Sequence, residues 1–223
     1  MIVPDQIVRT KRKTLAITVD SFGRLIVRAP IKCTEERINA FLQSKASWIE
    51  KYKNRARQSG VALPCGSVEG FSFPWLGGEY TVRTSGVSRV AVNQSTGEIK
   101  VPNEPFEKQC EKIRAKLKKE IKPYLEERVA YFSALMGVSV RSITVTQTKS
   151  RWGSCTAKNA VRFTFRLGYM PISVIDYVIV HELAHVSEKN HGKKFWAIVA
   201  KNCPDYQRKR AHLKSHGGYA ELF

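Results

Sequence analysis

Residues 173–191 read SVIDYVIVHELAHVSEKNH and contain three histidines and two glutamates. A helix predicted over 174–187 places His181 and His185 one turn apart on one face, so both imidazoles can reach a single ion. Glu182 is rotated by about 100° around the same helix, beside the position of a water on that ion. In the H-E-x-x-H arrangement, two histidines bind zinc and the glutamate acts as general base. The stretch therefore predicts a catalytic metal site.

His191 is the predicted third ligand, if the chain turns back after the helix at Asn190, a residue that tolerates left-handed backbone. Glu188, one turn after His185, is predicted to orient a ligand histidine. The spacing of the three histidines equals that of the metzincins, but Glu188 replaces the glycine of the metzincin turn. The methionines, at positions 1, 136 and 170, all precede the motif, so a Met-turn is excluded.

The N-terminal half has the pattern of strands with one helix. Apolar and polar residues alternate over 14–30 around DSFGR, which predicts a β-hairpin. Thr34 is the predicted N-cap of the helix that follows. One helical face is predicted to carry Ile38, Phe41, Leu42, Trp48, Ile49 and Tyr52. Residues 57–70 have the composition of a connector, and a second β-rich stretch runs to Pro102.

The C-terminal half begins with a helix predicted over 105–136, interrupted or kinked at Pro123 and ended by Gly137. Two or three strands follow, then the metal helix, for which Ser173 and Asp176 resemble a capping box. The predicted fold class is α+β. Its two domains are a β-rich domain with one packed helix (1–103) and a helical, antiparallel-sheet catalytic domain (104–223).

The composition is that of a soluble globular protein with a strong excess of positive charge. Lys and Arg number 38 against 19 acidic residues, giving a net charge of +19, which favours nucleic acid or another polyanion as a partner. No apolar run is long enough to span a membrane, and the N-terminus lacks signal-peptide order, so we expect a cytoplasmic protein. The five scattered cysteines predict neither disulfides nor a cysteine-ligated metal.

Three segments resemble a known family: SRWGSC (150–155), IDYVIVHELAHV (175–186) and NHGKKFW (190–196). They are similar to those of the YgjP-like metal-dependent hydrolases, which have a zincin-like metallopeptidase domain and are related to the SprT-like group. The resemblance implies one zinc ion per chain, held by His181, His185 and His191, with Glu182 as the catalytic base. It also implies that residues 151–155 line the active-site cleft.

The substrate stays open among three possibilities. A peptide is expected to bind along an edge strand beside the metal helix, such as 161–167. A nucleoside triphosphate is the second possibility, because members of the family are also described as UTP pyrophosphatases and guanidinium groups suit phosphate. The basic residues that favour it are Lys149, Arg151, Lys158, Arg162 and Arg166. The third possibility is a nucleic-acid or ribosome-associated protein whose zinc is structural.

Four further residues are candidates for substrate binding. Arg151 is predicted to stabilise charge on the substrate. Trp152 and Cys155 are predicted either to shape the cleft or to lie in the core. Tyr177 lies one turn before His181 and is predicted to contact the substrate or to face the core.

Overall fold

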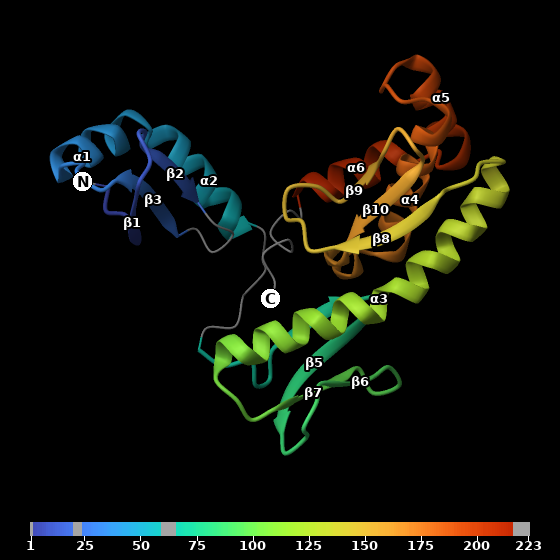
Figure 1. Cartoon of the computed structure of the whole chain (residues 1–223), viewed down its shortest axis with the longest axis horizontal. Coiled ribbons are helices and arrows are strands. Elements are labelled where there is room, and N and C mark those ends of the chain that lie inside the picture. Colours follow the sequence, from blue (N-terminus) through green and yellow to red (C-terminus); the bar gives the residue numbers. More distant parts are fainter. Residues whose placement is uncertain (1, 20–23, 59–65, 216–223) are drawn as a thin grey trace. The chain divides into compact units, whose positions relative to one another are not determined.

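The computed structural model describes residues 2–19, 24–58 and 66–215 and divides the chain into two units between residues 63 and 64 (Figure 1). The described part of the first unit ends at 58, and that of the second unit runs from 66 to 215. The boundary expected near residue 103 instead lies inside the second unit. The predicted α+β class is confirmed. Among the described helices, none is both long and apolar enough to cross a membrane.

The first unit is a three-stranded sheet covered by two helices. The strands are β1 (Gln6–Thr10), β2 (Ala16–Val19) and β3 (Leu25–Pro30). Their order is β1-β3-β2, with β1 parallel and β2 antiparallel to β3. The predicted hairpin is thus formed by β2 and β3, while its turn at 20–23 lies outside the described residues. The core joins β3 to the helices through Leu25, Val27, Ala29, Cys33, Ile38, Leu42 and Ile49.

The single helix expected after Thr34 is two helices, α1 (Glu35–Ser44) and α2 (Ala46–Gln58). The Thr34 hydroxyl accepts the N–H of Arg37, as predicted for an N-cap. Lys45 interrupts the helical backbone with φ −113° and ψ 14°, so the apolar face does not continue in phase. Trp48 and Tyr52 are consequently exposed and stack on each other at 4.2 Å instead of packing on the sheet.

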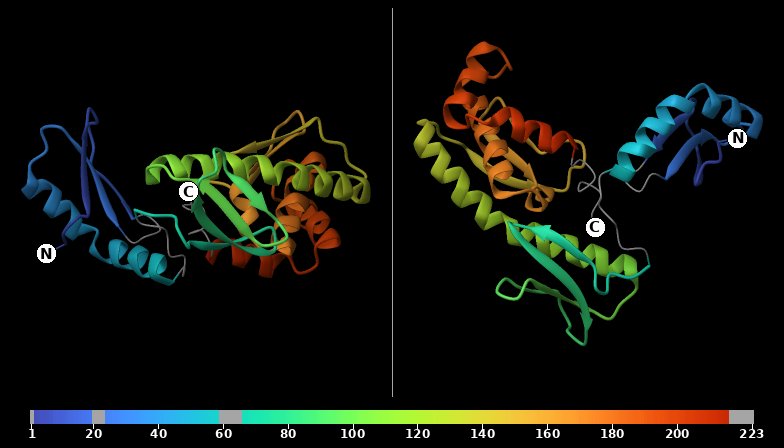
Figure 2. Two further views of the ribbon diagram at one scale, coloured as in Figure 1. Left: turned by 90° about the horizontal axis from the view of Figure 1, so that it is seen from below. Right: turned by 180° about the vertical axis from the view of Figure 1, so that it is seen from behind.

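The second unit begins with a four-stranded sheet. Its strands are β4 (Ser72–Trp75), β5 (Gly78–Ser85), β6 (Ala91–Asn93) and β7 (Glu98–Pro102). Their order is β4-β5-β7-β6, in which β5 and β7 are parallel and the outer pairs antiparallel. The helix α3 (Phe106–Met136) lies along this sheet with its first half and continues beside the C-terminal elements (Figures 1 and 2).

The long helix α3 runs as one element through Pro123 and bends along its length (Figure 1). Its buried residues recur mostly every four positions: Gln109, Ile113, Leu117, Ile121, Leu125, Val129 and Phe132. Because four residues turn an α-helix by about 40° more than one turn, this stripe rotates around the helix. The rotation lets one helix cover the four-stranded sheet first and the C-terminal elements afterwards. Gly137 ends it at φ 65°, as expected for a glycine C-cap.

The C-terminal elements form a second sheet and a group of helices. The strands are β8 (Ser142–Thr146), β9 (Gly153–Cys155) and β10 (Ala160–Thr164), followed by the 3-10 helix η1 (Phe165–Tyr169). Their order is β8-β10-β9, so β10 is central. Because β10 is parallel to β8 and antiparallel to β9, the sheet is mixed and not purely antiparallel as predicted. The remaining helices are α4 (Ile172–Ser187), α5 (Lys193–Asn202) and α6 (Tyr206–Ser215).

The β4–β5 hairpin explains why the domain boundary does not fall at 103. Its turn residue Leu76 donates its N–H to the carbonyl of Gly168 in η1 at 2.7 Å. Any side chain at Gly168 would overlap the Trp75 ring, which also packs edge-on against Tyr169. The four-stranded sheet therefore shares its core with the segment that leads into α4.

The helix α4 is fixed by its surroundings on several sides and contacts α3, α5, α6 and β9. Arg128 of α3 forms a bidentate ion pair with Asp176, at 2.8 and 2.7 Å. Asp176 is therefore not part of the predicted capping box, and the N-cap of α4 is Pro171 without a side-chain cap.

Candidate metal centre

Three imidazoles converge at the C-terminal end of α4. His181 and His185 lie one turn apart on this helix, and His191 lies in the connection between α4 and α5. The Nε2 atom of His191 is 3.1 Å from the Nε2 atoms of both His181 and His185. The predicted return of the chain after α4 thus brings the third histidine to the other two.

The donor set fits a single tetrahedral metal ion. Ligands at the zinc–nitrogen distance of about 2.0–2.1 Å would lie roughly 3.3 Å apart, close to the separations in this triad. Hydrogen bonds alone do not account for the arrangement. His185 uses its one N–H at Nδ1, so the single proton of a neutral His191 would have to serve both neighbours. A shared cation satisfies all three lone pairs at once.

The orientation of the His185 ring depends on a hydrogen bond at the C-terminal end of α4. Nδ1 of His185 donates to the backbone carbonyl of Glu188, the C-cap residue, at 3.1 Å. This bond directs Nε2 of His185 toward the triad. Glu188 was predicted to orient a ligand histidine, and the group that bonds to His185 is its main-chain oxygen rather than its carboxylate.

Burial keeps the imidazoles of His181 and His185 neutral. Desolvation, with smaller contributions from the neighbouring histidines and Arg210, lowers the pKa of His181 to about 4. Burial also lowers the pKa of His185. Neutral imidazoles offer the lone pairs that a metal requires.

An aromatic wall supports the triad, and the sequence analysis missed it. Phe195 of α5 is fully buried, and its ring lies 4.5–4.9 Å from all three imidazole rings. Trp196 stacks on His191 at 5.8 Å and on Tyr206 at 5.2 Å. Phe195 follows His191 by four residues, a spacing that could have indicated contact had a helix been predicted there.

Glu182 lies against strand β9 and is only 4% exposed. Desolvation raises the pKa of its carboxyl to about 7, and the nearby charge of Arg151 opposes this rise. Within the part of the chain that the structure describes, its Oε2 atom has no hydrogen-bond partner. A buried carboxyl with a free oxygen and a raised pKa is suited to accepting and returning a proton near neutral pH.

Gly153 makes room for this carboxyl. A methyl group at position 153 would lie 2.7 Å from both Cγ and Oε1 of Glu182, closer than any Cβ can approach. Glu182 therefore occupies the space that a side chain at position 153 of the RWGSC segment would fill. Sequence reasoning named Arg151, Trp152 and Cys155 in this segment but not the glycine between them.

The edge strand beside the metal helix is β9. The strand order β8-β10-β9 places β9 at the edge, and β9 contacts α4. The segment 161–167, expected to be the edge strand, instead comprises the central strand β10 and part of η1. That expectation was wrong because Phe163 and Val161 are buried between two neighbours, as their apolar character requires.

The remaining predicted substrate residues fall in different environments. Arg151 is exposed and within electrostatic range of Glu182. Trp152 is half-buried, and its carbonyl accepts the N–H of Thr164. Cys155 is half-buried, and desolvation raises the pKa of its thiol. Tyr177 is buried, with its ring 6.0 Å from that of His181, so it lies in the core beside the triad.

Comparisons with known proteins place the chain in a family. No curated protein matches it. Two solved structures are similar over 40% of this chain: the metallopeptidase zymogen abylysin of Pyrococcus abyssi (17% identity, 95% of that chain, TM-score 0.36) and the zymogen jannalysin of Methanocaldococcus jannaschii (19%, 94%, TM-score 0.34). The sequence model of the YgjP-like metallopeptidase domain matches residues 13–216. The chain therefore belongs to the YgjP-like family of metal-dependent hydrolases.

Proposed function

We propose that this protein is a zinc-dependent peptidase in which His181, His185 and His191 hold one zinc ion and Glu182 is the general base. The observation that carries the proposal is the position of Glu182. A buried carboxyl with a raised pKa, whose Oε2 atom has no hydrogen-bond partner within the described residues, directly follows His181, one of three histidines whose Nε2 atoms converge. A purely structural zinc site would have no use for such a group.

In this proposal the zinc ion and the protein side chains contribute different parts of the reaction. Zinc held by three imidazoles supplies Lewis-acid chemistry, lowering the pKa of a water and polarising a carbonyl oxygen. With the ion bound, Glu182 would accept the proton of the attacking water and return it to the leaving amine, which its pKa of about 7 allows in both directions. Phe195 and the Glu188 carbonyl hold the imidazoles in place.

A peptide substrate is supported by the family and by strand β9. Among the described strands, β9 pairs only with β10, which leaves the opposite edge of its backbone for an extended peptide. A peptide added there would run beside Glu182, because Gly153 of β9 lies in contact with that side chain.

The basic residues give less support to a nucleoside triphosphate. Arg166 is 2% exposed, and its Nη1 donates to the carbonyl of Gln147 at 2.7 Å, so it belongs to the core. Lys158 lines a pocket with Arg141 to which Arg151 does not contribute. The five basic side chains therefore do not converge on one triphosphate site.

The substitution Glu182→Gln tests the proposal. The variant should keep one zinc ion per chain by metal analysis and lose about 10²- to 10⁴-fold in peptide hydrolysis, the usual contribution of a general base. UTP serves as the competing substrate in the same assay, with diphosphate release as the readout. Undiminished peptide hydrolysis by the variant would refute the role of Glu182. Diphosphate release that disappears in the variant would assign the site to nucleotides.

A further inference from the structure

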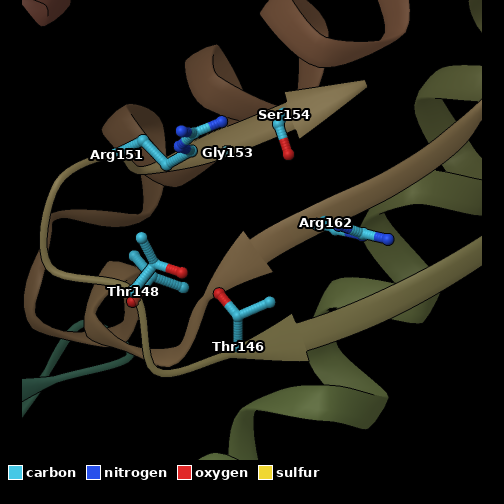
Figure 3. A pocket seen from close by; sticks show the side chains of 7 residues that line it. Thr146, Thr148, Arg151, Gly153, Ser154 and Arg162 are labelled. Atoms are coloured by element: carbon cyan, nitrogen blue, oxygen red, sulfur yellow. The ribbon is translucent and has the colours of Figure 1, made fainter. Parts of the chain in front are cut away.

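A polar pocket of about 240 Å³ lies between the loop 147–152 and the β8-β10-β9 sheet (Figure 3). Its lining consists of two arginines, four hydroxyl side chains and one glycine. They are Thr146, Thr148, Arg151, Gly153, Ser154, Arg162 and Thr164. The pocket has no carboxylate among its lining residues, so its character is that of a site for an anion.

Several of its charged and polar groups have no internal partner within the described residues, whereas the Thr146 hydroxyl donates to the carbonyl of Phe163 at 3.3 Å. Within the described residues, neither Arg151 nor Arg162 forms an ion pair with an acidic side chain or a side-chain hydrogen bond. Thr164 is 2% exposed, and its hydroxyl is buried without a hydrogen-bond partner. Buried hydroxyls are normally bonded, so the Thr164 hydroxyl indicates a ligand or water that the pocket accommodates.

The pocket and the catalytic carboxyl share one wall. Along β9, Gly153 contacts Glu182 while the next residue, Ser154, lines the pocket. Ser154 and Arg162 are directly paired across β9 and β10 and therefore point to the same face of the sheet. In an extended peptide bound along β9, alternate side chains of the peptide would lie on this face of the sheet. One of them would be next to the residue whose scissile peptide bond lies at Glu182.

The size and charge of the pocket select its occupant. Pockets that enclose a whole small-molecule ligand usually measure about 300–1,000 Å³, so 240 Å³ suits one side chain of a longer substrate better than a complete nucleotide. The chain carries a net charge of +19, which attracts acidic substrates.

We propose that this pocket is a specificity subsite that binds an acidic side chain of the peptide, through Arg151, Arg162 and the hydroxyls of Ser154 and Thr164. This inference rests on the proposed peptidase function. It gives the enzyme a preference for Asp or Glu close to the scissile bond.

Binding to zinc-loaded, full-length protein in the Glu182→Gln background tests the subsite without turnover. The probes are two hexapeptides that differ only by Glu or Gln at one central position, measured by calorimetry. The Glu peptide should bind about ten- to a hundredfold more tightly, the range expected for a charge-assisted hydrogen bond. Adding Arg162→Gln should abolish the difference, whereas Arg141→Gln, the same change at an exposed arginine outside this pocket, should preserve it.

A second substitution addresses the buried hydroxyl. Thr164→Val keeps the shape of the side chain and should reduce the Glu preference by severalfold. Equal binding of the two peptides, or a Glu preference that survives Arg162→Gln, would overturn the proposal. Inorganic phosphate or UTP binding that requires Arg162, with no Glu preference, would overturn it in favour of a phosphate site.

The outcomes separate this proposal from the proposed function. If the Glu preference depends on Arg162 but the wild-type protein hydrolyses no peptide, the subsite stands and the peptidase activity falls. If peptides are hydrolysed with Glu182 dependence but without an acidic preference, the peptidase stands and the subsite falls.

Discussion

The two faces of the short strand β9 differ sharply in chemistry. On one face, Gly153 adjoins Glu182, which follows His181 on α4, and burial raises the pKa of this carboxyl and lowers that of His181. On the other face, Ser154 adjoins a pocket with two arginines. Because side chains alternate along a strand, one residue step separates the proposed general base from the proposed specificity subsite.

The comparison shows how a small domain can keep the two roles independent. On the Glu182 face, desolvation suppresses the charge of Glu182, His181 and His185. The pocket face carries permanent charges, and the charge of Arg151 lowers the pKa of Glu182 against the rise that desolvation causes. Separation by the backbone of Gly153 keeps the carboxyl protonatable near pH 7.

Loss of a metal ligand should affect zinc binding on the Glu182 face of β9 and not peptide binding on the pocket face. His191→Ala should weaken zinc binding by at least about a hundredfold, because it removes one of three protein ligands. Competition with a chromophoric chelator measures this, with His212→Ala as the matched control outside the triad. The acidic-peptide preference of the pocket should persist. Unchanged zinc affinity in His191→Ala would mean that another group is the third ligand.

A side chain at position 153 should remove the separation between the Glu182 face and the pocket face of β9. Gly153→Ala would place a methyl group 2.7 Å from Glu182 and displace its carboxyl. Misplacement of a catalytic group on this scale costs about a hundredfold in kcat/KM. Gly86→Ala is the matched control, since a methyl there meets nothing within 4 Å. Full activity of Gly153→Ala would show that the close packing does not position Glu182.

The buried carboxyl should leave a signature in the stability of the zinc-free protein. Its folded pKa of about 7 lies above the reference value of 4.5, so the folded state keeps a proton that the unfolded chain loses. The stabilisation is therefore complete below pH 4.5 and disappears as the pH rises to about 7, a change of roughly 3 kcal/mol at most. Urea unfolding of the wild type and Glu182→Gln at both pH values isolates this contribution, since His181 titrates in both. A constant difference between the two proteins would contradict the raised pKa.

The smallest effect is expected at Glu188. Its backbone carbonyl orients His185, so Glu188→Ala should change zinc affinity by no more than about twofold, the range of ordinary surface substitutions. The chelator competition used for His191→Ala measures it. A loss as large as that of His191→Ala would instead make the Glu188 carboxylate a ligand.

The sequence predicted those parts of the site that follow from local periodicity. His181 and His185 lie on the same helix, and His191 is only six residues further along the chain. Their proximity could therefore be predicted without knowledge of the rest of the fold. The aromatic wall at Phe195, the packing of Gly153 on Glu182 and the edge position of β9 depend on contacts between distant segments. The spacing of residues along the sequence does not predict such contacts.

The same distinction explains the errors in the fold. Local signals identified the β2–β3 hairpin, the N-cap Thr34 and the C-cap Gly137. The boundary at 103 failed because Trp75 packs against Gly168 and Tyr169, a contact across more than ninety residues. Arg166 looked like a phosphate ligand in the sequence, yet its guanidinium lies over the Phe165 ring and bonds to Gln147.

The most direct test of the account is the X-ray absorption spectrum of the zinc-loaded protein. The account predicts one zinc ion per chain with three imidazole nitrogens at about 2.0–2.1 Å and one oxygen ligand, and loss of one imidazole in His191→Ala. A zinc site with sulfur ligands, or with fewer than three imidazoles in the wild type, would contradict it.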